Sequence, residues 1–194
     1  MTLRNTDERW GPVSQSLHWL VVALILATGT LGLVMGDMRN GPSKIEIYAL
    51  HKSLGLTILA LAALRLAWRM HAGAPLPAPA TPRWQGRFAT FTHWLLYGLL
   101  FAVPLSGWTF NSAAGYPLQW FKLFNLPALV ARDVELRQLA RDLHEWLFWS
   151  LVVVALLHAS AAVYHHLVLR DDTLGRMLPR AWRRRAVPPP LSQD

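Results

Sequence analysis

The chain has 194 residues, of which 53% are hydrophobic and only 15% charged, and its formal net charge is +8. Soluble domains carry about 25% charged residues, so this composition indicates a membrane protein, and its length suits a single domain. The sequence contains no cysteine, which excludes disulfides, zinc–thiolate sites, iron–sulfur clusters and covalently attached haem.

Four apolar segments are long enough to cross a bilayer, which takes about 20 mostly apolar residues in a helix. They are 17–35, 47–68, 88–110 and 143–169. No small-residue cleavage site follows the polar N-terminus, so the first segment is read as a retained span. Pro104 should kink the third. Because the connecting loops are short, we predict an all-α integral membrane protein, an antiparallel four-helix bundle.

The basic residues predict how this bundle sits in the membrane. Four spans place both termini on one side, and twelve of the nineteen lysines and arginines belong to that side. The positive-inside rule therefore predicts cytoplasmic termini. The net charge is then mainly an orientation signal, and no nucleic-acid partner is expected. Residues 1–180 form the predicted transmembrane domain, and the basic, Pro-rich residues 181–194 form a predicted disordered tail.

His144 and His158 are the most informative pair in the chain. They are fourteen residues apart, which on a helix is about 40° short of four full turns and roughly 21 Å along the axis. Both imidazoles therefore face one way at two depths. His18 and His51 lie near opposite ends of the first two spans, so His18 matches His158 in depth and His51 matches His144. Two imidazoles saturate a haem iron for electron transfer, and we predict two stacked, non-covalently bound haem groups.

A faint internal repeat leaves one ligand open. A His-Trp-Leu run occurs at His18 and again at His93, and Gly32 and Gly107 each follow their histidine by fourteen residues. His93 therefore competes with His18 as the partner of His158. We favour His18, because the helix of His93 offers no second ligand at its other end.

The remaining polar residues of the spans have two interpretations each. His165 and His166 close the fourth span as interfacial residues or as part of a quinone pocket, and together with His93 they are candidate proton relays. Arg65 and Arg69 could pair with haem propionates. They could equally be ordinary positive-inside anchors.

The order of these motifs resembles the prokaryotic cytochrome b561 family over about residues 10–180. The motifs are His-Trp-Leu at 18–20, Leu-His-Lys at 50–52, His-Trp-Leu-Leu-Tyr at 93–97, Pro-Leu-Ser-Gly-Trp at 104–108, the pair His144 and His158, and Asp-Thr-Leu-Gly-Arg-Met-Leu-Pro-Arg at 172–180. The resemblance implies a di-haem b cytochrome of the bacterial inner membrane that exchanges electrons with the quinone pool. It places the family's ligands on His18, His51, His144 and His158.

The resemblance also implies an activity, because the family includes a superoxide oxidase that takes electrons from superoxide outside and reduces ubiquinone. We therefore expect a superoxide:ubiquinone oxidoreductase whose partners are superoxide, the quinone pool and membrane lipid. One alternative is a b-type subunit that passes electrons from a partner dehydrogenase or hydrogenase to quinone. Another is a haem-free transporter or scaffold with a histidine proton path. A reduced-minus-oxidised spectrum separates this last alternative from the others, and co-purifying redox subunits would identify the second.

Overall fold

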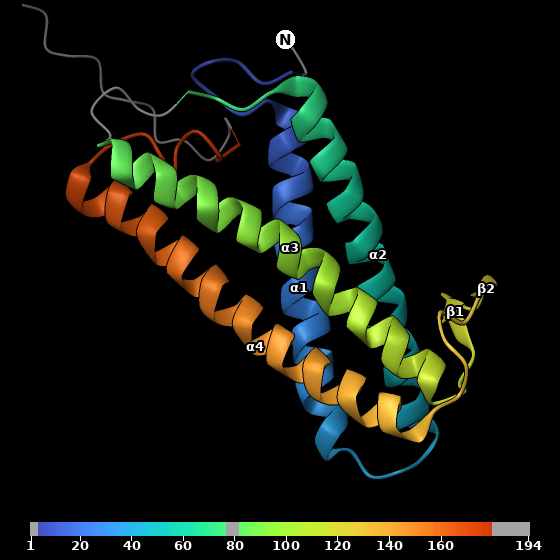
Figure 1. Ribbon diagram of the computed structural model, residues 1–194. Helices are drawn as coiled ribbons and strands as arrows, with labels where there is room; N and C mark the ends of the chain where they lie inside the picture. Colours follow the sequence, from blue (N-terminus) through green and yellow to red (C-terminus); the bar gives the residue numbers. More distant parts are fainter. Residues whose placement is uncertain (1–3, 77–81, 180–194) are drawn as a thin grey trace, which may run out of the picture.

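The computed structural model describes residues 4–76 and 82–179, and four long helices dominate this part of the chain (Figure 1). The helices are α1 (Pro12–Asp37), α2 (Pro42–Ala72), α3 (Arg83–Ala113) and α4 (Val134–Tyr164), and a π-helical turn, η1 (His165–Leu169), continues α4. All four are long and apolar enough to cross a membrane. The predicted all-α membrane bundle is confirmed, while the side on which the termini lie stays a prediction.

The helices extend beyond the apolar segments that predicted them. Helix α1 begins at Pro12 and α2 at Pro42, and proline suits a first turn because its missing N–H would have had no helical acceptor. Helix α4 begins nine residues before its apolar segment, where the carboxylate of Asp133 accepts a 2.9 Å hydrogen bond from the backbone N–H of Leu136. His144 therefore lies well inside α4, about three turns from its start.

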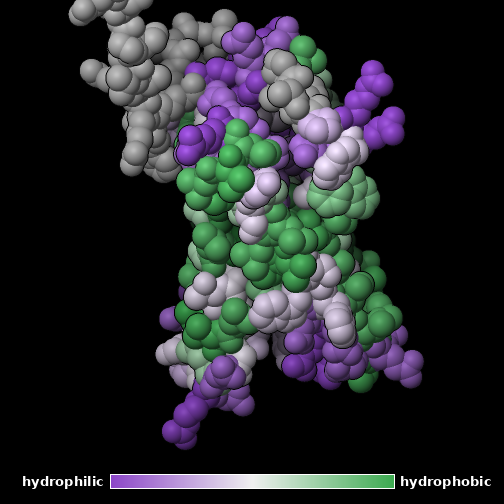
Figure 2. Space-filling view, turned by 90° about the vertical axis from the view of Figure 1, so that its left-hand side faces the viewer, coloured by the Kyte–Doolittle hydropathy of each residue, from purple (hydrophilic) through white to green (hydrophobic). Residues whose placement is uncertain are grey.

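The helices form two hairpins, α1–α2 and α3–α4, and in Figure 1 the second pair is inclined across the first. The beginning and the end of the described chain both lie at the top of that view, which we call the termini end. The opposite end, where α1 joins α2 and α3 joins α4, is the loop end. In Figure 2 a hydrophobic band separates two polar ends, as expected where lipid surrounds the middle of the bundle.

A small apolar core lies between the helices and is formed by Val21, Ile58, Ala62 and Leu100. Large apolar side chains elsewhere are exposed, among them Leu26 at 66%. In lipid there is no hydrophobic gain from burying such groups, so close packing and polar contacts stabilise the association of the helices.

The segment between α3 and α4 holds a short antiparallel hairpin that the sequence pattern did not predict. Its strands are β1 (Leu118–Trp120) and β2 (Phe124–Leu126). The indole N–H of Trp120 donates to the Thr57 hydroxyl at 3.0 Å, and the backbone N–H of Phe121 donates to the Ser53 hydroxyl at 2.9 Å. The hairpin is thereby fixed to the side of α2, close to His51 in the sequence.

At the termini end, the chain that follows α4 folds back over the start of α1. The side chains of Gln15 and Trp19 donate to the carbonyls of Arg176 and Met177, at 3.2 and 3.0 Å. The guanidinium of Arg176 in turn donates to the carbonyl of Leu76, at 2.8 Å. The predicted tail, 181–194, lies outside the described residues.

Candidate functional site

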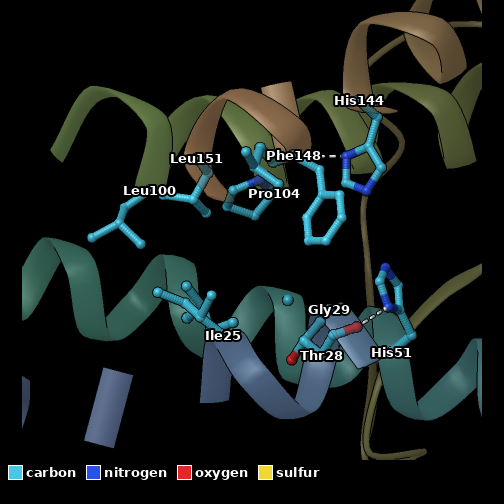
Figure 3. A pocket seen from close by; sticks show the side chains of 12 residues that line it. Ile25, Thr28, Gly29, His51, Leu100, Pro104, His144, Phe148 and Leu151 are labelled. Atoms are coloured by element: carbon cyan, nitrogen blue, oxygen red, sulfur yellow. Dashed lines mark hydrogen bonds between the residues drawn. The ribbon is translucent and has the colours of Figure 1, made fainter. Parts of the chain in front are cut away.

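His51 of α2 and His144 of α4 face each other across a pocket at the loop end, which we call the loop-side site (Figure 3). Their ring centroids are 6.2 Å apart and the ring planes are 82° to one another. The sequence matched these two residues by depth alone. The structure brings them together from different hairpins.

Backbone carbonyls orient both imidazoles. The Nδ1 atom of His51 lies 3.0 Å from the carbonyl oxygen of Thr28, and that of His144 lies 2.9 Å from the carbonyl oxygen of Val103. A carbonyl can only accept, so each Nδ1 carries the proton and donates it. Each Nε2 is then left with a free lone pair, which is the form in which neutral imidazole binds a metal.

The pocket beside the two rings is mostly apolar. Apolar side chains from all four helices line it: Ile25, Ile58, Leu100, Val103, Pro104, Phe148 and Leu151. Gly29 lies against Phe148, since a Cβ at Gly29 would be 3.1 Å from the Phe148 ring. The hydroxyl of Thr28 is buried and has no hydrogen-bond partner in the described part of the chain. The site is thus suited to a mostly apolar group.

A second cluster of histidines lies nearer the termini end and is called the termini-side site. The rings of His93 on α3 and His158 on α4 are in edge-to-face contact, with centroids 5.2 Å apart. His18 on α1 is within electrostatic range of both. Its Nδ1 atom is buried and, among residues 4–76 and 82–179, it has no hydrogen-bond partner. The structure therefore brings His158 together with both candidates for its partner, His18 and His93.

Two arginines of α2 border the termini-side site. The guanidinium of Arg69 lies 5.6 to 5.8 Å from the ring centroids of Trp10, Trp94 and Tyr97, and that of Arg65 lies 5.4 Å from Tyr97. Within the described ranges neither guanidinium pairs with a carboxylate. Two cations held by aromatic faces and lacking an anionic partner are suited to binding the acidic groups of a cofactor.

Comparison with known proteins identifies the family. A model of the prokaryotic cytochrome b561 family matches residues 9–180. The chain is 35% identical to cytochrome b561 homolog 2 of Escherichia coli (strain K12) over 92% of this chain and 95% of that protein. It is 30% identical to the probable superoxide oxidase CybB of Yersinia pestis, over 84% and 92% respectively. The chain belongs to the prokaryotic cytochrome b561 family.

As a family member, this chain is a multi-pass protein of the bacterial inner membrane that transfers electrons, and haem b is the cofactor that the family implies. The loop-side site fits that cofactor. Metal–imidazole bonds of about 2 Å on each side, plus about 1 Å from each nitrogen to its ring centre, require centroids about 6 Å apart. The 6.2 Å between His51 and His144 meets this requirement. The rings of His93 and His158 are closer together, with centroids 5.2 Å apart.

The remaining histidines lie apart from both clusters. His165, in η1, lies with its Nδ1 2.5 Å from a carboxylate oxygen of Asp171, and this is the single ion pair in the described ranges. His166 is exposed, and so is His71, which contacts the guanidinium of Arg4 at 3.1 Å. In this cytochrome b561 family member, neither His165 nor His166 therefore joins the three histidines of the termini-side site.

Two polar side chains, those of Ser106 and Trp68, were not singled out from the sequence. The Ser106 hydroxyl donates to the carbonyl of Val103 at 2.7 Å and lies 3.1 Å from Nδ1 of His144. The buried indole Nε1 of Trp68 has no partner among the described residues. Ser106 stands within the Pro-Leu-Ser-Gly-Trp motif, so the motif offered a signal. The sequence offered no signal for Trp68 beyond its place at a membrane boundary.

Proposed function

We propose that this protein takes electrons from superoxide outside the membrane and passes them through two haem b groups to ubiquinone. Family membership supports the electron transfer, and the relative from Yersinia pestis bears the name probable superoxide oxidase at 30% identity. Two histidine clusters at different depths support a pathway across the bilayer, since the residues that link them, His144 and His158, are fourteen positions apart on α4.

In this proposal His51 and His144 would hold the haem at the loop-side site. His18 and His158 are the ligands at the termini-side site, and the unpartnered Nδ1 of His18 supports that choice. His93 then stands beside the second pair without binding iron. A haem iron with two imidazole ligands supplies one-electron transfer and has no open position for oxygen binding.

The protein's own groups hold the imidazoles and neutralise charge. The carbonyls of Thr28 and Val103 fix the loop-side rings in the tautomer that presents Nε2. Arg65 and Arg69 would pair with propionates at the termini-side site, and this ionic contact would offset the cost of keeping two cations among apolar side chains.

The proposed direction depends on orientation. Twelve of the nineteen basic residues belong to the termini side, which favours cytoplasmic termini by the positive-inside rule. The loop-side site then faces the periplasm, where superoxide arrives. The termini-side site faces the cytoplasm.

The reaction balances as follows: two superoxide ions each give up one electron and become dioxygen, and one ubiquinone takes both electrons with two protons to become ubiquinol. His93, His165 and His166 are the candidate proton relays at the termini end. The side chain of Asp171, within hydrogen-bonding distance of Nδ1 of His165, would hold that imidazole in place at the end of the fourth span.

The observation that carries the proposal is the opposed pair His51 and His144, with the spacing of two axial ligands. Stopped-flow mixing of oxidised protein with superoxide, with and without a short-chain ubiquinone and with catalase present, tests it. We expect prompt appearance of a reduced b-type spectrum, followed by ubiquinol formation. If superoxide leaves the protein oxidised while ubiquinol reduces it readily, the protein is instead a quinone-linked carrier for a partner protein.

A further inference from the structure

His51 is held in a site made by one turn of α1. Its Nδ1 donates to the carbonyl of Thr28, and its ring lies against Gly32, four residues later, where a Cβ would be only 3.2 Å from Cε1 of the imidazole. In a helix, residue n+4 lies directly beyond carbonyl n along the axis. A glycine at that position therefore leaves the carbonyl oxygen open to a donor from the side.

His144 is held in the same way by α3. Its Nδ1 donates to the carbonyl of Val103, and Gly107, again four residues later, lies so close that a Cβ there would be 3.0 Å from Cε1 of the ring. The Ser106 hydroxyl has its own proton committed to Val103, so its oxygen accepts a second interaction from His144. We call each combination of a carbonyl and a glycine four residues later a histidine seat.

The two seats are equivalent in the internal repeat. Gly32 follows His18, and Gly107 follows His93, by fourteen residues in each case. Each hairpin thus uses its first helix to hold the histidine of its second helix. This gives the loop-side site a matched pair of imidazoles, each with its Nδ1 proton bonded to a backbone oxygen.

The termini-side site lacks such seats. The buried Nδ1 of His18 has no acceptor, and no hydrogen bond joins the imidazole of His93 or His158 to any described residue. The repeat is broken here as well, because the α2 residue fourteen positions after His51 is Arg65, whereas the corresponding α4 residue is His158. The loop-side site has two orienting carbonyls, whereas the termini-side site has a partly buried guanidinium, that of Arg65.

These differences should make the reduction potential of a bound iron lower at the loop-side site than at the termini-side site. An imidazole whose N–H is hydrogen-bonded to a carbonyl is a more basic ligand, which stabilises ferric over ferrous iron and lowers the reduction potential. An unbonded imidazole and the nearby cations Arg65 and Arg69 favour the ferrous state. Lys52, beside His51, opposes this trend, but its ammonium is half-buried and bonded to the side-chain oxygen of Asn111 and the carbonyl of Pro117.

We propose that the two histidine seats make the loop-side site the lower-potential site, so that electrons pass spontaneously from the loop side to the termini side. The inference rests on the proposed function, since it requires a haem at each site. It adds to that function a built-in direction, which agrees with entry of electrons from outside. It also assigns Ser106, Gly32 and Gly107 as positioning residues.

Equilibrium redox titration of the purified holoprotein, followed by its b-type absorbance, tests this inference. His144→Ala removes the loop-side ligand, so the midpoint potential that remains belongs to the termini-side site. We expect the other midpoint to be the lower one in the unaltered protein. Ser106→Ala removes one acceptor and should raise only that lower midpoint. Gly107→Ala should raise it further, by pushing the ring away from the Val103 carbonyl.

The matched control is Gly98→Ala, on the same helix, where a Cβ would meet nothing within 4 Å and both midpoints should stay unchanged. If Gly107→Ala loses the loop-side haem, the inference is tested by Ser106→Ala alone, because that change removes only a hydroxyl. The inference is overturned if the loop-side midpoint is equal or higher, or if Ser106→Ala leaves it unchanged. Fewer than two haem b groups per chain would overturn the proposed function itself, whereas two haems in reversed order overturn only this inference.

Discussion

The rings of His93 and His158 meet edge to face with their centroids 5.2 Å apart, whereas those of His51 and His144 are 6.2 Å apart. This difference supports the proposal that His18, and not His93, is the partner of His158. The buried Nδ1 of His18 has no hydrogen-bond partner among the described residues, which supports the same choice.

Single alanine variants of the histidines should therefore differ in haem content. We expect His93→Ala to keep both haem groups, while His158→Ala and His144→Ala each lose one, since nothing nearby replaces a lost iron ligand. The haem-to-protein ratio, measured as the pyridine haemochrome, checks this. Loss of a haem from His93→Ala, together with full haem in His18→Ala, would transfer the ligand role to His93.

A reporter fusion tests the orientation on which the direction of transfer depends. A reporter joined after Arg185 should be active only in its cytoplasmic form, because basic residues follow the last span directly. The control is a reporter inserted between β2 and α4, which should be active only in its periplasmic form. Reversed signals would exchange the compartments assigned to the two sites.

Arg69 should contribute to stability through the three aromatic rings around it. Cation–π contacts contribute about 0.5 to 2 kcal/mol each, and the contacts of the partly exposed Arg69 should lie toward the lower end of that range. Loss of its three contacts in Arg69→Gln should therefore lower the free energy of unfolding by about 1 to 2 kcal/mol. Thermal unfolding in detergent measures this. The exposed Arg83→Gln is the control, and equal stability of the two variants would argue against the aromatic contribution.

Asp171 should make the termini end sensitive to acid. Partial burial alone would raise the pKa of its carboxyl, but hydrogen bonds from His165 and Thr173 outweigh burial and lower it below the ordinary value of 3.8. A carboxyl whose pKa is lowered in the folded state stabilises that state at pH values above its ordinary pKa. This stabilisation is lost as the pH falls through the lowered pKa.

Asp171→Asn should accordingly be less stable than the unaltered protein near neutral pH, and the difference should shrink as the pH falls below 3.8. Thermal unfolding from about pH 3 to pH 7 measures the difference. Glu46→Gln, at an exposed position, serves as the reference. A difference that grows on acidification would show that the hydrogen bonds do not favour the charged carboxyl.

Charge reversal at the loop end should slow the reaction with superoxide alone. That side carries seven basic and six acidic residues, so Lys122→Glu or Arg137→Glu changes the sign of its net charge. We expect superoxide to reduce the haem a few-fold more slowly, and the effect should be larger at low salt, where screening is weak. Reduction by ubiquinol should be unchanged. Arg83→Glu, at the other end of the bundle, should change neither the rate of reduction by superoxide nor the salt dependence of that rate.

The sequence by itself determined the features that depend on local periodicity. Four apolar segments of sufficient length predicted four spanning helices, and the fourteen-residue interval placed His144 and His158 on one face of α4, because helical geometry repeats every few residues. The depth match of His51 with His144 followed from the same reasoning, and the structure brings these rings to within 6.2 Å of one another, edge to face. The polar ends of the helices and the hairpin of β1 and β2 carried no comparable signal.

Only the tertiary structure decided how the helices are rotated and inclined relative to one another. That rotation brings His93 into contact with His158, places His51 on the Thr28 carbonyl, and seats His144 against Gly107. These contacts join residues that are 23 to 65 positions apart. Hydropathy and spacing describe one helix at a time, whereas the approach of a side chain to another helix's backbone depends on packing between helices.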